Sequence, residues 1–320
     1  MIQWAVFKGF LLPEVPITKF YFNIDWIVFL LLSSICNVIF IWTITIIFDI
    51  NSAAWHVYCN SLTTLWIFSG IDKIIKTASK NPITKKKNIV ITGGSLGLGL
   101  EITKLYLLKP DVNKVIILDI QKPKIKHEKL IFINHDFSND DYDNFKWAKD
   151  VDVLICNAGV RQKLNATTVD KNNVIKINWT SQIKLIELVL ENNKKYLSIM
   201  GVGSTLAYLA PKGLGSYSGS KAGLLSMFEA LRLEVDSSIA ISTIIPGQLD
   251  TTMFADKNPS SFLAPIISRH KLAKKIEEII ERRWKGEFVY PVYGRFLPIV
   301  KVLPYSVQQV LRYLSGIDEC

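Results

Sequence analysis

The sequence predicts a doubly wound α/β domain with a parallel sheet, preceded by an N-terminal transmembrane anchor. Short apolar runs alternate with segments of helical spacing between residues 88 and 285. This alternation is typical of a parallel sheet that helices cover on both faces. A long uncharged stretch comes before it. The 320 residues are 49% hydrophobic and 21% charged, which excludes a largely disordered chain, and the mean hydropathy of +0.24 suggests a membrane-embedded part.

The first predicted element is the anchor, because Trp26–Phe48 contains no charged residue. At about 1.5 Å per residue, a helix of this length spans roughly 35 Å, enough for a bilayer core of about 30 Å. A signal peptide has a shorter apolar core that lies nearer the N-terminus. Residues 50–71 are also uncharged but more polar, and they fit a second span, a re-entrant hairpin or an interfacial helix.

Lysines indicate which side of the membrane the rest of the chain occupies. Only Lys8 and Lys19 precede the uncharged stretches. The lysines that follow them directly are Lys73, Lys76, Lys80, Lys85, Lys86 and Lys87. The positive-inside rule therefore predicts that the domain after residue 73 faces the cytosol, whether one or two spans precede it.

The strands and helices of the α/β region follow in order. The apolar runs predict strands at Asn88–Thr92, Lys114–Ile120, Leu130–Asn134, Val151–Cys156, Tyr196–Met200 and Ile239–Ile245. Helical spacing occurs at Glu101–Leu108, Val174–Leu190 and Lys221–Val235. We therefore divide the chain into an anchor and basic linker (1–87), a catalytic domain (88–285) and an aromatic, basic tail (286–320).

A glycine-rich turn, Thr92–Gly99, follows the first strand and begins a helix. Such a turn lets backbone N–H groups approach a pyrophosphate at the helix N-terminus. Asp119 ends the second strand, where its carboxylate can accept hydrogen bonds from ribose hydroxyls and repel a 2′-phosphate. Ser95 in the turn is not basic, so NAD is favoured over NADP. Lys122 and Lys124 leave NADP possible.

The sequence Tyr217-Ser218-Gly219-Ser220-Lys221 places a phenol and an ammonium on one face of a helix, four residues apart. We expect Lys221 to lower the pKa of Tyr217 by its charge. The phenol can then exchange a proton with an alcohol or carbonyl while hydride moves to or from nicotinamide. Ser204, after the strand Tyr196–Met200, can polarise the same oxygen.

In this order, the motifs resemble those of the short-chain dehydrogenases/reductases over roughly residues 88–285. The further matching motifs are His135-Asp136-Phe137, Asn157-Ala158-Gly159, Asn178 within KINWT, and Pro246-Gly247 followed by Thr251. The resemblance implies a Rossmann-like fold and an oxidoreductase. One departure is Gly203, where the family often has a second serine.

The resemblance also implies roles for individual residues. Tyr217 would be the acid/base, Lys221 would assist it and bind ribose, Ser204 would hold the substrate oxygen, and Asn178 would keep a water-linked proton path. The residues implied to contact NAD, or NADP, are Thr92, Gly93, Ser95, Leu96, Gly97, Gly99, Asp119, Asp136, Phe137, Asn157, Ala158, Gly159, Tyr217, Lys221, Pro246, Gly247 and Thr251.

The anchor makes the chain similar to the membrane-anchored branch of this family, which includes retinol dehydrogenases and 17β-hydroxysteroid dehydrogenases. That likeness implies the endoplasmic reticulum or lipid droplets as the location, and a possible homodimer. Aromatic and basic residues alternate in the tail 287–304, which suits contact with lipid headgroups, although a lid over the substrate is the alternative.

The substrate is expected to be lipophilic, because the segment Thr252–Arg269 is apolar and lies where such folds cover their substrate. The net charge of +10 flanks the most apolar segments, which favours membrane lipid over nucleic acid as a partner. The four cysteines and four histidines show no metal-ligand spacing, so we assign no metal.

The sequence thus predicts a membrane-anchored, NAD-preferring dehydrogenase that interconverts an alcohol and a carbonyl on a retinoid, a steroid or another lipid-like molecule. One alternative is an NADPH-dependent lipid ketone reductase. The other is a non-catalytic membrane or lipid-droplet protein that retains the fold.

Overall fold

In the computed structural model, the described residues are 86–139, 146–162, 167–193, 196–254, 262 and 264–318, with single positions and short stretches before residue 86. Helix α3, Val38–Ile47, is the described part of the predicted anchor, and the rest of Trp26–Phe48 lies outside the described residues. Across these described parts of the chain, no helix has both the length and the apolarity that crossing a bilayer requires.

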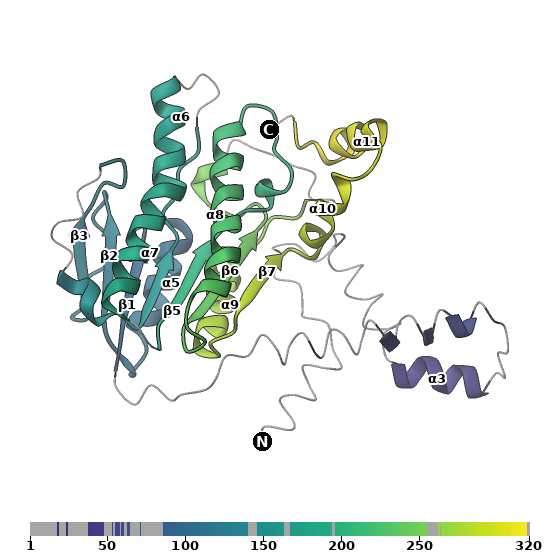
Figure 1. The fold of residues 1–320 in the computed structure, drawn as a ribbon, viewed down its shortest axis with the longest axis horizontal. Coiled ribbons are helices and arrows are strands. Elements are labelled where there is room, and N and C mark those ends of the chain that lie inside the picture. Colours follow the sequence, from purple (N-terminus) through teal and green to yellow (C-terminus); the bar gives the residue numbers. More distant parts are fainter. Residues whose placement is uncertain are drawn as a thin grey trace.

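The core of the protein is a seven-stranded sheet in which all neighbouring strands run parallel (Figure 1). The strands are β1 (Lys87–Thr92), β2 (Val112–Asp119), β3 (Leu130–Asn134), β4 (Val153–Cys156), β5 (Ser198–Val202), β6 (Ala240–Pro246) and β7 (Gly286–Tyr290). Their order across the sheet is β3-β2-β1-β4-β5-β6-β7. The predicted doubly wound parallel fold is confirmed.

Helices cover both faces of this sheet (Figure 1). They are α5 (Gly97–Leu107), α6 (Thr168–Ile175), α7 (Ser181–Asn192), α8 (Gly215–Glu234) and α9 (Arg269–Glu281), with α10 (Leu297–Val300) and α11 (Tyr305–Ser315) at the C-terminal end. A π-helical turn, Lys176–Thr180, joins α6 to α7.

Alternate residues of β1 show how the two layers are built. Ile89 and Ile91 pack into a core with α5 and α9, whereas Val90 packs into a second core with α7 and α8. Because both faces are buried, the strand is apolar at successive positions instead of alternating with polar residues. The near-continuous apolar runs of the sequence follow from this double burial.

The sheet continues past residue 285, where the sequence placed the end of the catalytic domain. Strand β7 pairs in parallel with β6, so residues 286–290 belong to the sheet and not to a separate tail. The helix that precedes it, α9, buries Leu272, Ile276 and Ile279 against the core. These apolar residues have helical spacing, but the many charged residues between them make the pattern hard to recognise in the sequence.

The strand order reverses between β1 and β4, which are neighbours although β2 and β3 separate them in the chain. The connections from these two strands therefore leave in opposite directions across the sheet. In open parallel sheets such a reversal opens a crevice at the carboxyl ends of the strands. The glycine turn after β1 and Asn157 after β4 both lie at this edge.

Candidate active site

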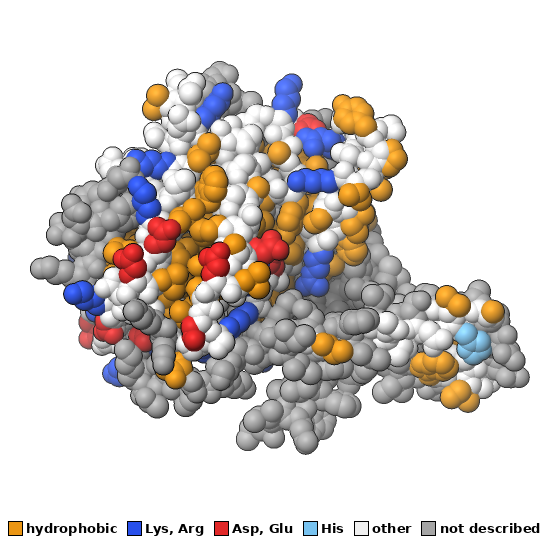
Figure 2. All heavy atoms as spheres, in the orientation of Figure 1, with side chains coloured by type: hydrophobic (Ala, Val, Ile, Leu, Met, Phe, Trp, Pro, Cys, Tyr) orange, Lys and Arg blue, Asp and Glu red, His pale blue; other side chains and the backbone are white. Residues whose placement is uncertain are grey.

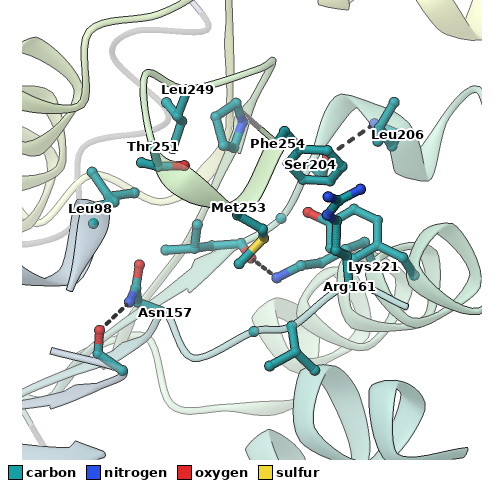
Figure 3. A pocket seen from close by; sticks show the side chains of 18 of the residues that line it. Leu98, Asn157, Arg161, Ser204, Leu206, Lys221, Leu249, Thr251, Met253 and Phe254 are labelled. Carbon is teal, nitrogen blue, oxygen red and sulfur yellow. Dashed lines mark hydrogen bonds between the residues drawn. The ribbon is translucent and has the colours of Figure 1, made fainter. Parts of the chain in front are cut away.

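A cavity of about 690 Å³ lies at this edge of the sheet (Figure 3). Most predicted site residues line it, namely Gly93, Leu96, Gly97, Asp119, Asp136, Phe137, Asn157, Ala158, Gly159, Ser204, Tyr217, Lys221, Pro246, Gly247 and Thr251. Thr92, Ser95, Gly99 and Asn178 do not line it. These four lie behind the cavity wall, where they contact the lining residues.

The glycine turn approaches its neighbours too closely for side chains. Gly93 has φ +64°, and a Cβ there would lie 2.9 Å from the Cα of Ala158. A Cβ on Gly99 would lie 2.1 Å from the Gly93 carbonyl oxygen. Helix α5 begins after Leu96, whose side chain provides no cap for the first-turn amides. The turn therefore presents a helix N-terminus directly to the cavity, as a pyrophosphate site requires.

Thr92, the first residue of this turn, connects it to the loop that follows β4. Its Oγ1 accepts hydrogen bonds from the N–H groups of Asn157 at 2.9 Å and Ala158 at 2.8 Å, and it donates to Gln182 Oε1 at 3.0 Å. Asn157 Nδ2 in turn donates to the carbonyls of Thr92 and Gly93 at 3.0 Å each. The ends of β1 and β4 are thus joined by side chains at the base of the cavity.

Two carboxylates occupy the part of the cavity beyond the glycine turn. Asp119 accepts backbone hydrogen bonds from Ser95 and Gln121, both at 3.0 Å, so its position is fixed at the wall. Asp136 accepts one from Ser138 at 2.8 Å, and this bond lowers the pKa of the Asp136 carboxyl. A fixed carboxylate after β2 can bind ribose hydroxyls, as the sequence predicts for Asp119.

Tyr217 lies in the first turn of α8, with only 5% of its surface exposed. Burial raises the pKa of the phenol, and its hydrogen bond with Ser204 opposes that rise. The Ser204 hydroxyl also accepts from the Leu206 N–H at 3.2 Å, which holds it at the end of β5. The predicted meeting of Ser204 and Tyr217 is therefore present in the structure.

Lys221 is buried one helical turn further along α8, and it donates from Nζ to the Val202 carbonyl at 2.8 Å. Burial lowers its pKa to about 8. The sequence predicts that Lys221 lowers the pKa of Tyr217, but in this structure that pKa is raised by burial, and the contribution that opposes the rise comes from Ser204. Desolvation penalises both charged forms, and neither the sequence motif nor its spacing reveals burial.

Asn178 sits in the π-helical turn and is fully buried. Its Oδ1 accepts from the Val160 N–H at 2.7 Å, and its Nδ2 donates to the Val160 carbonyl at 2.8 Å and to Ser220 Oγ at 3.0 Å. A Cβ on Gly159 would meet Asn178 Oδ1 and Lys221 Nζ at 3.4 Å each. Both polar groups therefore border the space that the missing side chain of Gly159 leaves, and the proton path through Asn178 stays a prediction.

The structure adds residues that the sequence motifs do not identify. Phe254 contacts the Tyr217 ring edge to face, with ring centroids 5.6 Å apart. The guanidinium of Arg161 lies over the ring of Phe254, with its Cζ 5.1 Å from the ring centroid. Figure 3 shows both beside Ser204 and Lys221. Tyr293, Leu297 and Ile317 reach the cavity from the C-terminal end. These residues come from segments far apart in the chain, so no local pattern connects them.

Comparisons with known proteins agree with this geometry. The profile of the short chain dehydrogenase family matches residues 87–261. A Saccharomyces cerevisiae protein, named only as an uncharacterized oxidoreductase, is 30% identical over 77% of this chain and 87% of its own length. An 11-beta-hydroxysteroid dehydrogenase-like protein of Arabidopsis thaliana is 25% identical, over 78% of this chain and 88% of its own.

A solved structure has the same fold. A 4-hydroxyisoleucine dehydrogenase complexed with NADH superposes with a TM-score of 0.57 at 23% sequence identity, over 63% of this chain and 96% of that one.

Proposed function

The chain belongs to the short chain dehydrogenase family, and on that premise we propose that it is a membrane-anchored, NAD-preferring enzyme that interconverts an alcohol and a carbonyl on a lipophilic substrate. The coarser activity, that of a nicotinamide-dependent oxidoreductase, follows from membership of the family. The observation that carries the proposal is the meeting of Ser204, Tyr217 and Lys221 in the same cavity as the glycine turn.

The residues present fit a nicotinamide dinucleotide. A Cβ would fill the turn at Gly93 and at Gly99, and the first turn of α5 has no side-chain cap. These features would hold a pyrophosphate, and Asp119 would hold the adenosine ribose. When bound, the nicotinamide accepts or delivers a hydride.

The proton and the orientation of the substrate come from the chain itself. In alcohol oxidation, Tyr217 must first lose its own proton to become a phenolate; the substrate O–H bond then breaks, its proton passes to this phenolate oxygen, and the hydride of the broken C–H bond would pass to the bound nicotinamide. In carbonyl reduction, the Tyr217 phenol donates that proton to the carbonyl oxygen. Burial raises the pKa of the phenol and so favours its protonated form, which is the form that donates to a carbonyl oxygen. Ser204 orients the substrate oxygen, and Lys221 would bind the nicotinamide ribose.

The preference for NAD is supported by Asp119. Its carboxylate is held at the cavity wall by two backbone N–H groups, next to Ser95, which carries no positive charge. A 2′-phosphate would meet this negative charge at short range, whereas two ribose hydroxyls would donate to it. Because Lys122 and Lys124 follow Asp119 in the chain, the net charge of this segment does not favour NAD. The preference for NAD depends instead on the position of the Asp119 carboxylate.

A lipophilic substrate is supported by the part of the cavity around Tyr217. Leu206, Leu209, Leu214, Met253 and Phe254 line it. Apolar walls with a few polar groups are typical of sites for lipid-like ligands. A retinoid, a steroid or a long-chain secondary alcohol would suit this wall, and the similarity to a hydroxysteroid dehydrogenase-like protein supports the steroid class.

Membrane anchoring is supported at both ends of the chain. Near the N-terminus, Trp55 Nε1 donates to Thr45 Oγ1 of α3 at 2.8 Å, so the two uncharged stretches contact each other. At the C-terminal end, large apolar side chains are exposed on α10, α11 and the residues beside them (Figure 2). They include Phe296, Ile299, Val302, Tyr305, Val310, Tyr313 and Leu314. Together they suit an enzyme of the endoplasmic reticulum or lipid-droplet surface whose domain faces the cytosol.

The test uses the full chain reconstituted in liposomes that carry retinol, hydroxysteroids or long-chain secondary alcohols, with NAD in the aqueous phase. We expect NADH to form with at least one class, and the protein to remain in the membrane fraction after alkaline carbonate extraction. Binding of NADH without turnover on any alcohol or ketone would instead favour a non-catalytic role. Release of the protein by carbonate would contradict the proposed membrane anchor, but it would leave the proposed oxidoreductase activity unaffected.

A further inference from the structure

Two residues that precede the predicted anchor contact the catalytic domain. Thr18 is buried and forms an antiparallel β-bridge with Ile267, and Lys271 Nζ donates to the Thr18 carbonyl at 3.4 Å. Further along the chain, the Ile24 N–H donates to the Phe262 carbonyl at 3.1 Å. Backbone contacts at two separate positions therefore hold the chain before the anchor against the domain.

These contacts determine the face of the membrane on which the anchor begins. The uncharged stretch starts at Trp26, two residues after Ile24. Two residues of extended chain cover at most about 7 Å, whereas the hydrocarbon core of a bilayer is about 30 Å thick. The uncharged stretch therefore starts on the same face as the catalytic domain.

The chain rejoins the domain at β1, which begins at Lys87. A single span over Trp26–Phe48 would place Ile24 and Lys87 on opposite faces of the membrane, and it would separate Ile24 from Phe262. A chain that enters and leaves the membrane by one face keeps every one of these contacts.

The described residues of the two uncharged stretches meet in antiparallel order. Thr45 Oγ1 accepts from Trp55 Nε1 at 2.8 Å, and nearer the start of α3 the Trp42 Nε1 donates to Thr63 Oγ1 at 3.5 Å. Earlier residues of the first stretch thus contact later residues of the second, as in a hairpin. The described positions between 53 and 64 are helical, as α3 is (Figure 1).

These paired segments have polar side chains inside and apolar side chains outside. Thr45 and Cys59 are buried, with Oγ1 and Sγ 4.0 Å apart. Ile46, Ile47 and Val57 are 77%, 67% and 66% exposed. Hydrogen bonds between helices satisfy polar groups away from water, and apolar outer faces suit lipid. This arrangement explains how the second stretch can lie in a membrane although it is more polar than the first.

We propose that the chain between Trp26 and Ile71 enters and leaves the membrane by the cytosolic face, so that the N-terminal segment and the catalytic domain lie together on that face. This inference rests on the proposed membrane anchor and narrows its form to a hairpin. The sequence between these two residues contains no lysine or arginine, whereas both of its flanks contain lysines. The positive-inside rule therefore favours the cytosol for both flanks.

The same contacts bring the wall of the cavity close to the membrane. Ile267, the partner of Thr18, also forms a bridge with Leu249, which lines the cavity. The cavity wall is thus joined through one residue to the segment that leads into the lipid. A lipophilic substrate that arrives from the membrane would meet this side of the domain first.

The experiment determines on which side of the membrane the N-terminus lies. The full-length protein, with an N-terminal tag that contains a glycan acceptor and a protease site, is inserted into endoplasmic-reticulum microsomes and recovered after carbonate extraction. We expect the tag to remain unglycosylated and to be removed by protease added outside the vesicles. The same tag on a secreted protein is the control, and it should be glycosylated and protected from the protease.

A pair of cysteines tests the contact on which the inference depends. The variant with both Ile24→Cys and Phe262→Cys should form a disulfide when the membrane-bound protein is mildly oxidised, because backbones joined by a hydrogen bond lie within the reach of a disulfide. The disulfide is detected as a change in gel mobility that a reducing agent reverses. Each single variant is a matched control, since it keeps the native cysteines and lacks the pair, and it should show no such change.

The outcomes separate this inference from the proposed function. Loss of the protein from the membrane fraction would contradict the anchor itself. A membrane-bound protein whose tag is glycosylated, or protected from the protease, would overturn the hairpin and leave both the anchor and the oxidoreductase activity intact. Absence of the disulfide in the double variant would also overturn it, because the contact that fixes the topology would not exist in the membrane.

Discussion

Asn178 and Val160 are joined by two opposed hydrogen bonds, in which the Val160 N–H donates to Asn178 Oδ1 at 2.7 Å and Asn178 Nδ2 donates to the Val160 carbonyl at 2.8 Å. The amide side chain of Asn178 thus satisfies both backbone polar groups of Val160, as a neighbouring strand would, in the loop that follows β4. Because the same loop leads to Arg161 and Gln162, Asn178 is a positioning residue for the substrate side of the cavity.

Replacement of Asn178 by alanine should therefore destabilise the fold. The loss of three hydrogen bonds of a fully buried side chain is expected to lower the free energy of unfolding by about 1–3 kcal/mol. Urea denaturation measures this change. As a control, Asn192→Ala removes a single exposed bond to the Leu188 carbonyl and should cost less than about 0.5 kcal/mol. Equal losses in the two variants would contradict the positioning role.

The glycine turn provides a second prediction. Gly99→Ala should abolish NADH binding, since the added Cβ would lie 2.1 Å from the Gly93 oxygen and 2.6 Å from Asn157 Nδ2, and the turn must open. Gly219→Ala is the matched control on α8, because a Cβ there meets nothing within 4 Å. It should raise stability by about 0.5–1 kcal/mol through the better helix propensity of alanine. NADH binding by Gly99→Ala at wild-type strength would contradict the assigned turn.

The Asp119 carboxylate predicts the choice of cofactor. The wild type should bind NADH more tightly than NADPH. The Asp119→Asn variant keeps the shape of the side chain and removes its charge. It should reduce the ratio of the NADPH to the NADH dissociation constant about tenfold or more. Fluorescence titration of both cofactors measures the two dissociation constants. A wild type that prefers NADPH would mean that the lysines after Asp119, and not its carboxylate, dominate the ribose end.

Burial of Lys221 predicts how stability depends on pH. The pKa of this ammonium falls from 10.5 to about 8 in the folded protein, so between these values the unfolded chain holds a proton that the folded protein has lost. Stability contributed by this group therefore rises with pH across the window from about 8 to 10.5, by at most about 3 kcal/mol. The raised pKa of Tyr217 acts in the opposite direction above pH 10, so stability is measured at pH 10 and below.

Chemical denaturation of the wild type and of Lys221→Met at pH 7, 8, 9 and 10 measures this effect. The variant loses the hydrogen bond to Val202, which shifts its whole curve, but only the wild type should gain stability between pH 8 and 10 relative to the variant. Parallel curves over this range would contradict a buried ammonium at position 221.

The sequence predicts most of the sheet because its strands are buried on both faces and hence read as unbroken apolar runs. Six of the seven strands are confirmed, with ends that shift by one or two residues. β5, for example, starts at Ser198 because Tyr196 adopts φ 61°. Strand β7 is different: its sequence, GEFVY, has a charged residue and only partial burial at four of its five positions. Aromatic and proline residues follow β7 directly, so its sequence resembles that of the irregular segment after it and does not indicate an edge strand.

The site divides in the same way. The residues that contact each other along one turn or one helix, such as those of the glycine turn and the pair Tyr217 and Lys221, have spacings that the sequence displays. Arg161 and Phe254 meet only because two loops more than ninety residues apart converge over the cavity. Burial is also invisible in a spacing, and for this reason the direction of the Tyr217 pKa shift differs from the prediction.

The most direct test of the account is the turnover of Tyr217→Phe, measured as NADH formation or consumption at saturating substrate, alongside its affinity for NADH. Turnover should fall by about 10²–10⁴-fold, because the proton of the substrate oxygen then has no group to exchange with. The affinity for NADH should stay that of the wild type, since the glycine turn and Asp119 are unchanged. Turnover at the wild-type rate would contradict the assignment of Tyr217 as the proton-transferring group.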